Sequence, residues 1–153
     1  MTDKKEKKYS LEEKLKYKIP YKWKIQSFTK DGSKAQCVAY IDARDVMDLL
    51  DKAIGCENWS DEYRFEANQW LCGLSLKVGG QWVTKWDTGV AGDFEAEKAA
   101  ISDAFKRAAV KWGIGRFLYD LDIKWVNLDQ YKNPIDPNGK RIYDLTSYFK
   151  KER

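Results

Sequence analysis

Residues 95–119 read EAEKAAISDAFKRAAVKWGIGRFLY and predict the helix around which the rest of the chain is arranged. An α-helix turns by about 100° per residue, so its apolar residues share one face: Ile101, Ala104, Phe105, Ala108 and Trp112. A stripe of this kind predicts a helix that covers an apolar core. Gly113 and Gly115 predict the end of the helix, because glycine readily takes the left-handed conformation that closes helices.

The opposite side of this helix carries charge. Lys106 and Arg107 fall on its two flanks with Asp103 between them, so we expect both cations to stand in solvent. Three further apolar residues, Ala99, Ala100 and Val110, turn away from the stripe. Their position suggests that something packs on a second side of the helix, such as another subunit.

The rest of the chain predicts an α+β fold with the order β-β-α-β-β-β-α, in which the long helix covers an antiparallel sheet. The expected elements are strands at 21–28 and 35–41, a helix at 43–54, and three strands between 59 and 88. A capping box at Ser10 predicts a short helix. A last short strand is expected at 124–128, a loop at 129–142 and weak helix at 142–153. We therefore expect a basic, partly disordered arm (1–19), a core domain (20–128) and a C-terminal extension (129–153).

The amino-acid composition excludes several classes of function. The 153 residues are 43% hydrophobic, with no histidine and three cysteines. Lack of histidine removes His-based acid–base chemistry, and the odd cysteine count suits reduced packing residues in a cytoplasm. The sequence shows neither a membrane-length apolar run nor a signal region, so we expect an unexported protein. Alternation on the strands favours a core position for four tryptophans, Trp59, Trp70, Trp82 and Trp86.

Charge is unevenly distributed along the chain. The net charge is +4, yet residues 1–24 hold nine Lys against four acidic residues, which leaves −1 for the remainder. A binder of single-stranded nucleic acid needs cations spaced to follow phosphates. The body offers such cations near the long helix and on the first strand: Lys24, Lys106, Arg107, Lys111 and Arg116.

Two segments resemble the Rad52/Rad22 family of single-strand annealing proteins, in its short bacterial or phage form. They are VAYIDARDVMDLLDKAIGCENW (38–59) and DTGVAGDFEAEKAAISDAFKRAAVKWGIGRFLYDLD (87–122). The resemblance implies ATP-independent annealing of single-stranded DNA in recombination and repair by a homo-oligomeric ring. It also implies a single-strand-binding protein and an exonuclease as partners.

The same resemblance suggests roles for individual residues. Lys106 and Arg107 match a basic pair that holds the DNA backbone, and Lys24 aligns loosely with a further groove arginine. The family has another arginine where this chain has Val110, and Lys111 is the nearest replacement. Val38 and Leu118 lie where family members place apolar side chains against bases, although ordinary core roles explain both equally well.

Two other functions remain open from the residues alone. The α-β-β-β-α order of residues 42–115 is also that of a double-stranded RNA-binding module. Asp120, Asp122 and Lys124, with Asp87, could form an Mg²⁺ nuclease site. We find no Gly-rich phosphate loop and no dinucleotide fingerprint. The sequence therefore predicts no catalytic residue, no metal and no cofactor.

Overall fold

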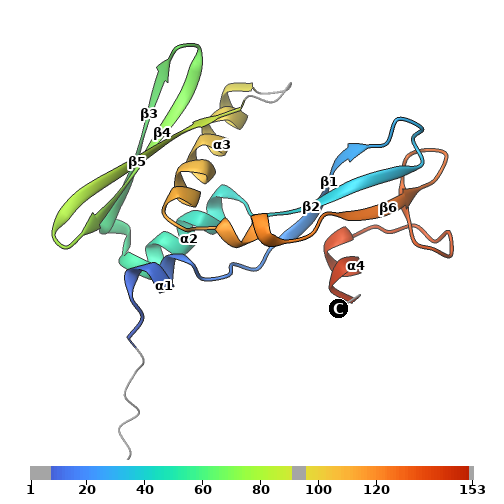
Figure 1. The fold of residues 1–153 in the computed structure, drawn as a ribbon, viewed down its shortest axis with the longest axis horizontal. Coiled ribbons are helices and arrows are strands. Elements are labelled where there is room, and N and C mark those ends of the chain that lie inside the picture. The colour runs from blue at the N-terminus through green and yellow to red at the C-terminus, as the bar shows by residue number, and fades with distance from the viewer. Residues whose placement is uncertain (1–7, 91–95, 152–153) are drawn as a thin grey trace, which may run out of the picture. The chain divides into compact units, whose positions relative to one another are not determined.

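The computed structural model describes residues 8–90 and 96–151 (Figure 1). Contacts divide the chain into two compact units. We call residues 1–19 with 42–117 the meander unit, and residues 20–41 with 118–153 the hairpin unit. The α+β class and the predicted order of elements are confirmed, with the predicted strands distributed over two separate sheets.

The meander unit contains α1 (Leu11–Leu15), α2 (Ala43–Ile54), β3 (Trp59–Glu66), β4 (Gln69–Val78), β5 (Gln81–Gly89) and α3 (Ala96–Lys111). Its three strands form an antiparallel meander in which Trp59 lies opposite Leu76 and Trp70 opposite Gly89. Alternation places Cys72, Leu74 and Leu76 on the inner face of β4, where all three are fully buried. Helix α3 lies along this sheet, chiefly against β5 and β4 (Figure 1).

The buried face of α3 is wider and more alanine-rich than the sequence predicts, because it extends to Ala100 on one side and Ala109 on the other. Ala104, Phe105 and Ala108 are buried as expected, whereas Ile101 and Trp112 are only half-buried. Ala100 was expected to face away from the core and is in fact 3% exposed. The prediction was wrong because β5 approaches that side of the helix within the same chain.

Two glycines allow close contacts in this unit, one between β5 and α3 and one between β4 and β5. A Cβ atom on Gly89 would lie 1.9 Å from the carbonyl oxygen of Ala100, so β5 touches the backbone of α3 directly. A Cβ atom on Gly73 would lie 2.7 Å from the ring of Trp86, which faces it across β4 and β5. Both contacts require a residue without a side chain.

Local signals set the helix ends. The hydroxyl of Ser10 accepts a hydrogen bond from the backbone N–H of Glu13 at 3.2 Å, as the predicted capping box requires. At α2, the backbone N–H of Asp42 donates to the carboxylate of Asp45 at 2.8 Å. Helix α3 ends at Lys111, and Gly113 and Gly115 follow with φ of 98° and 75°. Residue 95, where we expected the helix to begin, lies outside the described residues.

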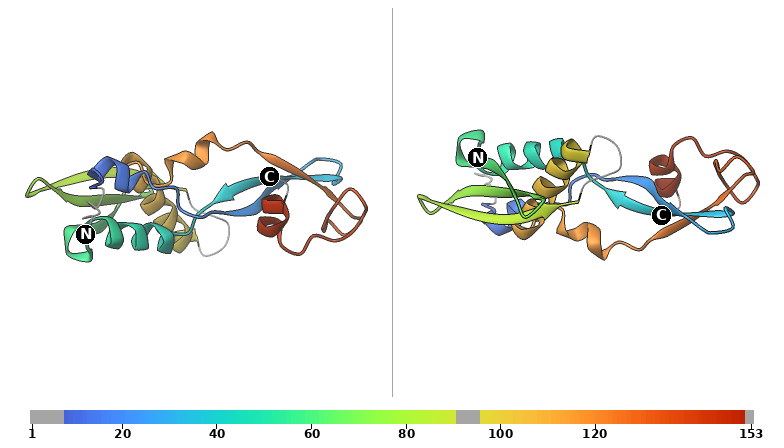
Figure 2. Two further views of the ribbon diagram at one scale, coloured as in Figure 1. Left: turned by 90° about the horizontal axis from the view of Figure 1, so that it is seen from below. Right: turned by 90° about the horizontal axis from the view of Figure 1, so that it is seen from above.

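The hairpin unit contains β1 (Lys22–Phe28), β2 (Lys34–Tyr40), β6 (Lys124–Leu128), β7 (Pro134–Ile135) and α4 (Leu145–Lys151). The strands form one antiparallel sheet in the order β1-β2-β6-β7. Helix α4 lies alongside β1 (Figure 2) and packs Phe149 against Trp23, with ring centroids 5.1 Å apart. Ala35, Cys37, Val126 and Leu128 complete the core on this inner face of the sheet.

Three details of this architecture differ from the sequence predictions. Trp82 is 51% exposed and is not a core residue, because the register places it opposite Lys77, on the face of the sheet that points away from the buried side chains of β4. Trp59, Trp70 and Trp86 are half-buried. The expected loop at 129–142 contains the short strand β7, and the predicted helix near the end of the chain is present as α4.

The three cysteines are free thiols, and two of them lie in separate cores. Cys72 is buried in the meander unit and Cys37 in the hairpin unit, whereas Cys56 is exposed. Burial raises the pKa of Cys72 to about 12 and also raises the pKa of Cys37. Both thiols are therefore inert packing groups in the folded protein.

Candidate nucleic-acid interface

Helix α3 presents Lys106 and Arg107 on the side away from its buried face. The guanidinium of Arg107 donates from Nε to the carboxylate of Asp103, 2.9 Å away and one turn earlier, and its side chain remains 47% exposed. The same carboxylate accepts the backbone N–H of Val90 at 2.8 Å, just beyond the end of β5. Asp103 therefore positions Arg107 and partly offsets its charge. Lys106 is half-buried.

The other two cations near the end of α3 bind the fold itself. Lys111 donates from Nζ to the backbone carbonyl of Trp86, and its Nζ lies 3.9 Å from the carboxylate of Asp87. Arg116 donates from Nη2 to the carbonyls of Val110 and Lys111, at 2.9 and 3.2 Å. Carbonyls at the end of a helix carry partial negative charge, so Arg116 stabilises the last turn of α3. Lys111 instead ties that turn to β5.

Lys24 and Val38 lie in the hairpin unit. They are directly opposite each other on β1 and β2, so they share one face of the sheet. Lys24 is exposed and its Nζ lies 4.8 Å from the ring centroid of Tyr40, whereas Val38 is half-buried. Leu118 is also half-buried, in the 3₁₀ turn Arg116–Asp120 (η2). The structure thus brings the predicted site residues together in two groups, one on and after α3 and one on β1–β2.

The two units differ in charge. The meander unit carries seventeen basic and seventeen acidic side chains, a net of zero; its residues 42–117 alone carry ten basic and thirteen acidic side chains, a net of −3. The hairpin unit carries eleven basic and seven acidic side chains, a net of +4. The cations on α3 therefore act in acidic surroundings, and the sheet cations act in basic ones.

The residues of the nuclease alternative do not converge. Lys124 lies on the inner face of its sheet, with Nζ 5.0 Å from the ring centroid of Phe149 and 5.4 Å from that of Trp23. Asp120 and Asp122 are exposed before β6. Across residues 8–90 and 96–151, no cluster of three or more His, Cys, Asp or Glu could hold a metal ion.

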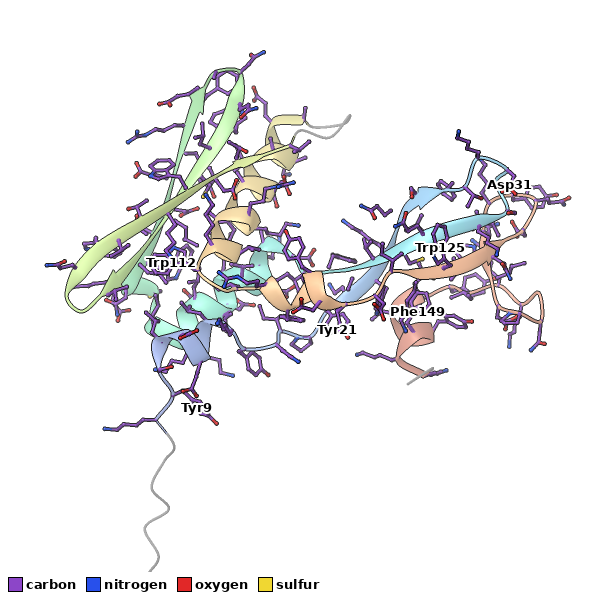
Figure 3. All side chains as sticks on the ribbon, in the orientation of Figure 1. Tyr9, Tyr21, Asp31, Trp112, Trp125 and Phe149 are labelled. Atoms are coloured by element: carbon purple, nitrogen blue, oxygen red, sulfur yellow. The ribbon has the colours of Figure 1, made fainter. Side chains whose placement is uncertain are left out.

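Sequence reasoning missed the exposed aromatic side chain of Trp125 on β6 (Figure 3). Val126 and Leu128 are buried under α4, and they alternate along this strand with Trp125 and Asn127, which are exposed. The alternation was visible in the sequence, but it does not say which of the two faces is covered.

Within the ranges that the structure describes, no helix is long and apolar enough to cross a membrane.

Comparison with known proteins agrees with the resemblance. Residues 72–136, from β4 to β7, match the model of a class of double-strand break repair proteins. That class is the Rad52/22 family. The chain is similar to the single-stranded DNA-binding protein DdrA of Deinococcus deserti, with 42% identity over 118 residues that cover 75% of this chain and 58% of that protein.

DdrA of Deinococcus radiodurans is 39% identical over 109 residues, which cover 70% of this chain and 52% of that protein. The chain thus spans about half the length of these relatives.

Proposed function

We propose that this protein binds single-stranded DNA and anneals complementary strands without ATP or bond chemistry, as a repeated assembly of subunits in a bacterial or phage-infected cell. The observation that carries the proposal is the joint match to the Rad52/22 family and to two relatives described as single-stranded DNA-binding proteins. Cations on the outward side of α3 give that function a physical basis.

In the proposed complex, Lys106 and Arg107 hold the DNA backbone. Phosphate contacts of this kind position a strand but do not read its sequence, which suits an annealing protein that must accept any complement. The salt bridge from Arg107 to Asp103 is exposed, so it is weak enough to exchange for a phosphate. Lys111 and Arg116 keep the end of α3 in place. Lys24 on β1 is proposed as a separate contact to the DNA backbone within the hairpin unit.

The proposed assembly into a ring would multiply the few cations that α3 offers. Residues 42–117 have a net charge of −3, so the α3 pair of one subunit is a weak site for a polyanion. Single-strand affinity grows with the number of phosphates neutralised. Copies arranged around a ring would repeat the α3 pair along one strand and supply that number.

A charge-matched pair of variants tests the assignment of the site. We expect K106A/R107A to lose most single-strand binding and annealing. K52A/K77A removes the same charge from exposed positions on α2 and β4 of the same unit and should behave like the wild type. Annealing is followed with labelled complementary oligonucleotides, and thermal unfolding confirms that both variants fold. Wild-type annealing by a folded K106A/R107A variant would show that the site lies elsewhere.

A competition experiment addresses the class of nucleic acid. At fixed salt, unlabelled single-stranded DNA should displace a labelled oligo(dT) at far lower concentration than double-stranded RNA does. Equal competition, or a preference for the RNA duplex, would contradict the proposal and favour the double-stranded RNA-binding module.

A further inference from the structure

The outer face of the hairpin unit, opposite α4, combines exposed aromatic and basic side chains. Trp125 is 54% exposed, although Val126 beside it on β6 is only 5% exposed. The strand register places Trp125 opposite Gln36, in the middle of the sheet. Burying a tryptophan normally stabilises a protein, so one displayed at the centre of a sheet face suggests a binding surface.

Cations flank this tryptophan in the neighbouring rows of the same face. One row runs across the sheet through Lys34, Asn127 and Ile135, and an isolated bridge extends it from Ile135 to Arg141. Strands are spaced by roughly 4.8 Å, which puts the two cations of this row about 14 Å apart. On the other side of Trp125, Lys24 lies opposite Val38, and Lys22 lies opposite Tyr40.

This face carries no acidic residue at the described positions that the register assigns to it: Lys22, Lys24, Ser27, Lys34, Gln36, Val38, Tyr40, Trp125, Asn127 and Ile135. Apart from its lysines, the polar side chains of this face are uncharged. The hydroxyl of Ser27, for example, donates to the side-chain amide oxygen of Gln36 at 3.1 Å. The face therefore complements a ligand that is both anionic and aromatic.

We propose that Trp125 is a stacking platform for an unpaired base, with Lys34 and Arg141 holding the phosphates on either side. This inference rests on the proposed single-stranded DNA binding and adds a contact to the base itself. Aromatic side chains bind single strands in this way without sequence preference, because every base has a π face. A base stacked by its face keeps its pairing edge open, so stacking is compatible with annealing.

The experiment compares two exposed tryptophans on two substrates. Trp82 is 51% exposed on β5 and serves as the matched control for Trp125 at 54%. The substrates are labelled oligo(dT) and an abasic oligonucleotide of the same length, measured by fluorescence anisotropy at one salt concentration. We expect W125A to weaken oligo(dT) binding roughly fivefold to a hundredfold. W125A should leave abasic binding within about twofold, and W125F should retain most of the affinity because an aromatic ring remains.

Other outcomes separate this proposal from the function on which it rests. A wild-type protein that binds neither substrate overturns the proposed function together with this inference. If the wild type binds oligo(dT) and W125A binds it equally well, or loses both substrates equally, only the stacking role is overturned. The stacking role is also overturned if W82A shows the larger loss. A changed assembly mass for W125A with unchanged oligo(dT) binding would identify the face as a protein interface and overturn it too.

Discussion

The outward side of α3 and the outer face of the hairpin sheet display cations in different surroundings. On and beside α3, Arg107 and Lys111 lie next to the carboxylates of Asp103 and Asp87. On the sheet, Lys24 lies over the ring of Tyr40, in a unit with a net charge of +4. The number of cations in a segment is therefore a poor measure of its positive potential. We expect binding through α3 to depend on repetition, whereas the sheet adds contacts to individual bases.

The largest expected effect is a loss of folding stability, and it distinguishes the core of the meander unit from the core of the hairpin unit. Phe105 is 1% exposed between α3 and its sheet, and Phe149 is 3% exposed beneath the hairpin sheet. We expect F105A to cost about 3–5 kcal/mol of folding free energy, because it removes a buried ring and leaves a cavity. Thiol labelling should then modify Cys72 faster while Cys37 stays protected, and F149A should reverse this order. Equal exposure of both thiols in both variants would show that the units do not open separately.

A second stability prediction concerns the contact between β5 and α3. G89A would place a methyl group 1.9 Å from the carbonyl oxygen of Ala100, so the strand or the helix must move. We expect a loss of about 3 kcal/mol, at the upper end for overpacking, measured by denaturant unfolding. Val90 is 67% exposed, and V90A is the neighbouring control that should change little. A G89A variant as stable as the wild type would contradict the close packing described for this sheet.

Removing one negative charge from α3 should have a smaller effect, and it should strengthen DNA binding. D103N removes the carboxylate beside Arg107 and should strengthen oligo(dT) binding about threefold at low salt. Screening should abolish that gain at high salt. The amide oxygen of asparagine can still accept the N–H of Val90, so we expect the fold to persist. If D103N weakens binding, Asp103 matters more for positioning Arg107 than for offsetting its charge.

The smallest effect is local to the β1–β2 turn of the hairpin unit. Hydrogen bonds from the side chain and backbone of Ser33 and from Thr29 lower the pKa of Asp31 to about 2. A lowered pKa in the folded state means that the turn is stabilised above the ordinary carboxyl pKa and loses that stabilisation as the pH falls towards 2. NMR titration of the Asp31 carboxyl group measures this directly. A midpoint near the ordinary aspartate value of 3.8 would show that these bonds do not form in solution.

Much of the fold could be predicted because its signals are local. Capping at Ser10, glycines after Lys111 and alternation along β4 each depend on a few neighbouring residues, and each is confirmed. Burial of Ala100 could not be predicted, since it depends on Gly89 approaching from another element. Separation into two units has the same cause, because β6 pairs with β2 across more than eighty residues of intervening chain.

The candidate site was predicted unevenly for a related reason. Helical spacing is enough to place Lys106 and Arg107 away from the core, but it does not show that Asp103 holds Arg107. Lys111 and Arg116 carry the charge expected of phosphate ligands, yet their donors reach backbone carbonyls that only the fold brings near. Trp125 was missed because tryptophan usually belongs to a core and α4 lies too far along the chain to be assigned to one face of β6.

The salt dependence of oligo(dT) affinity tests most directly whether the α3 pair binds the DNA backbone. For single strands, the slope of log K against log salt changes by about 0.7 for each phosphate contact. We therefore expect K106A/R107A to have a slope shallower than that of the wild type by about 1.4 or more, with K52A/K77A unchanged. Identical slopes for the wild type and a folded K106A/R107A variant would contradict the account.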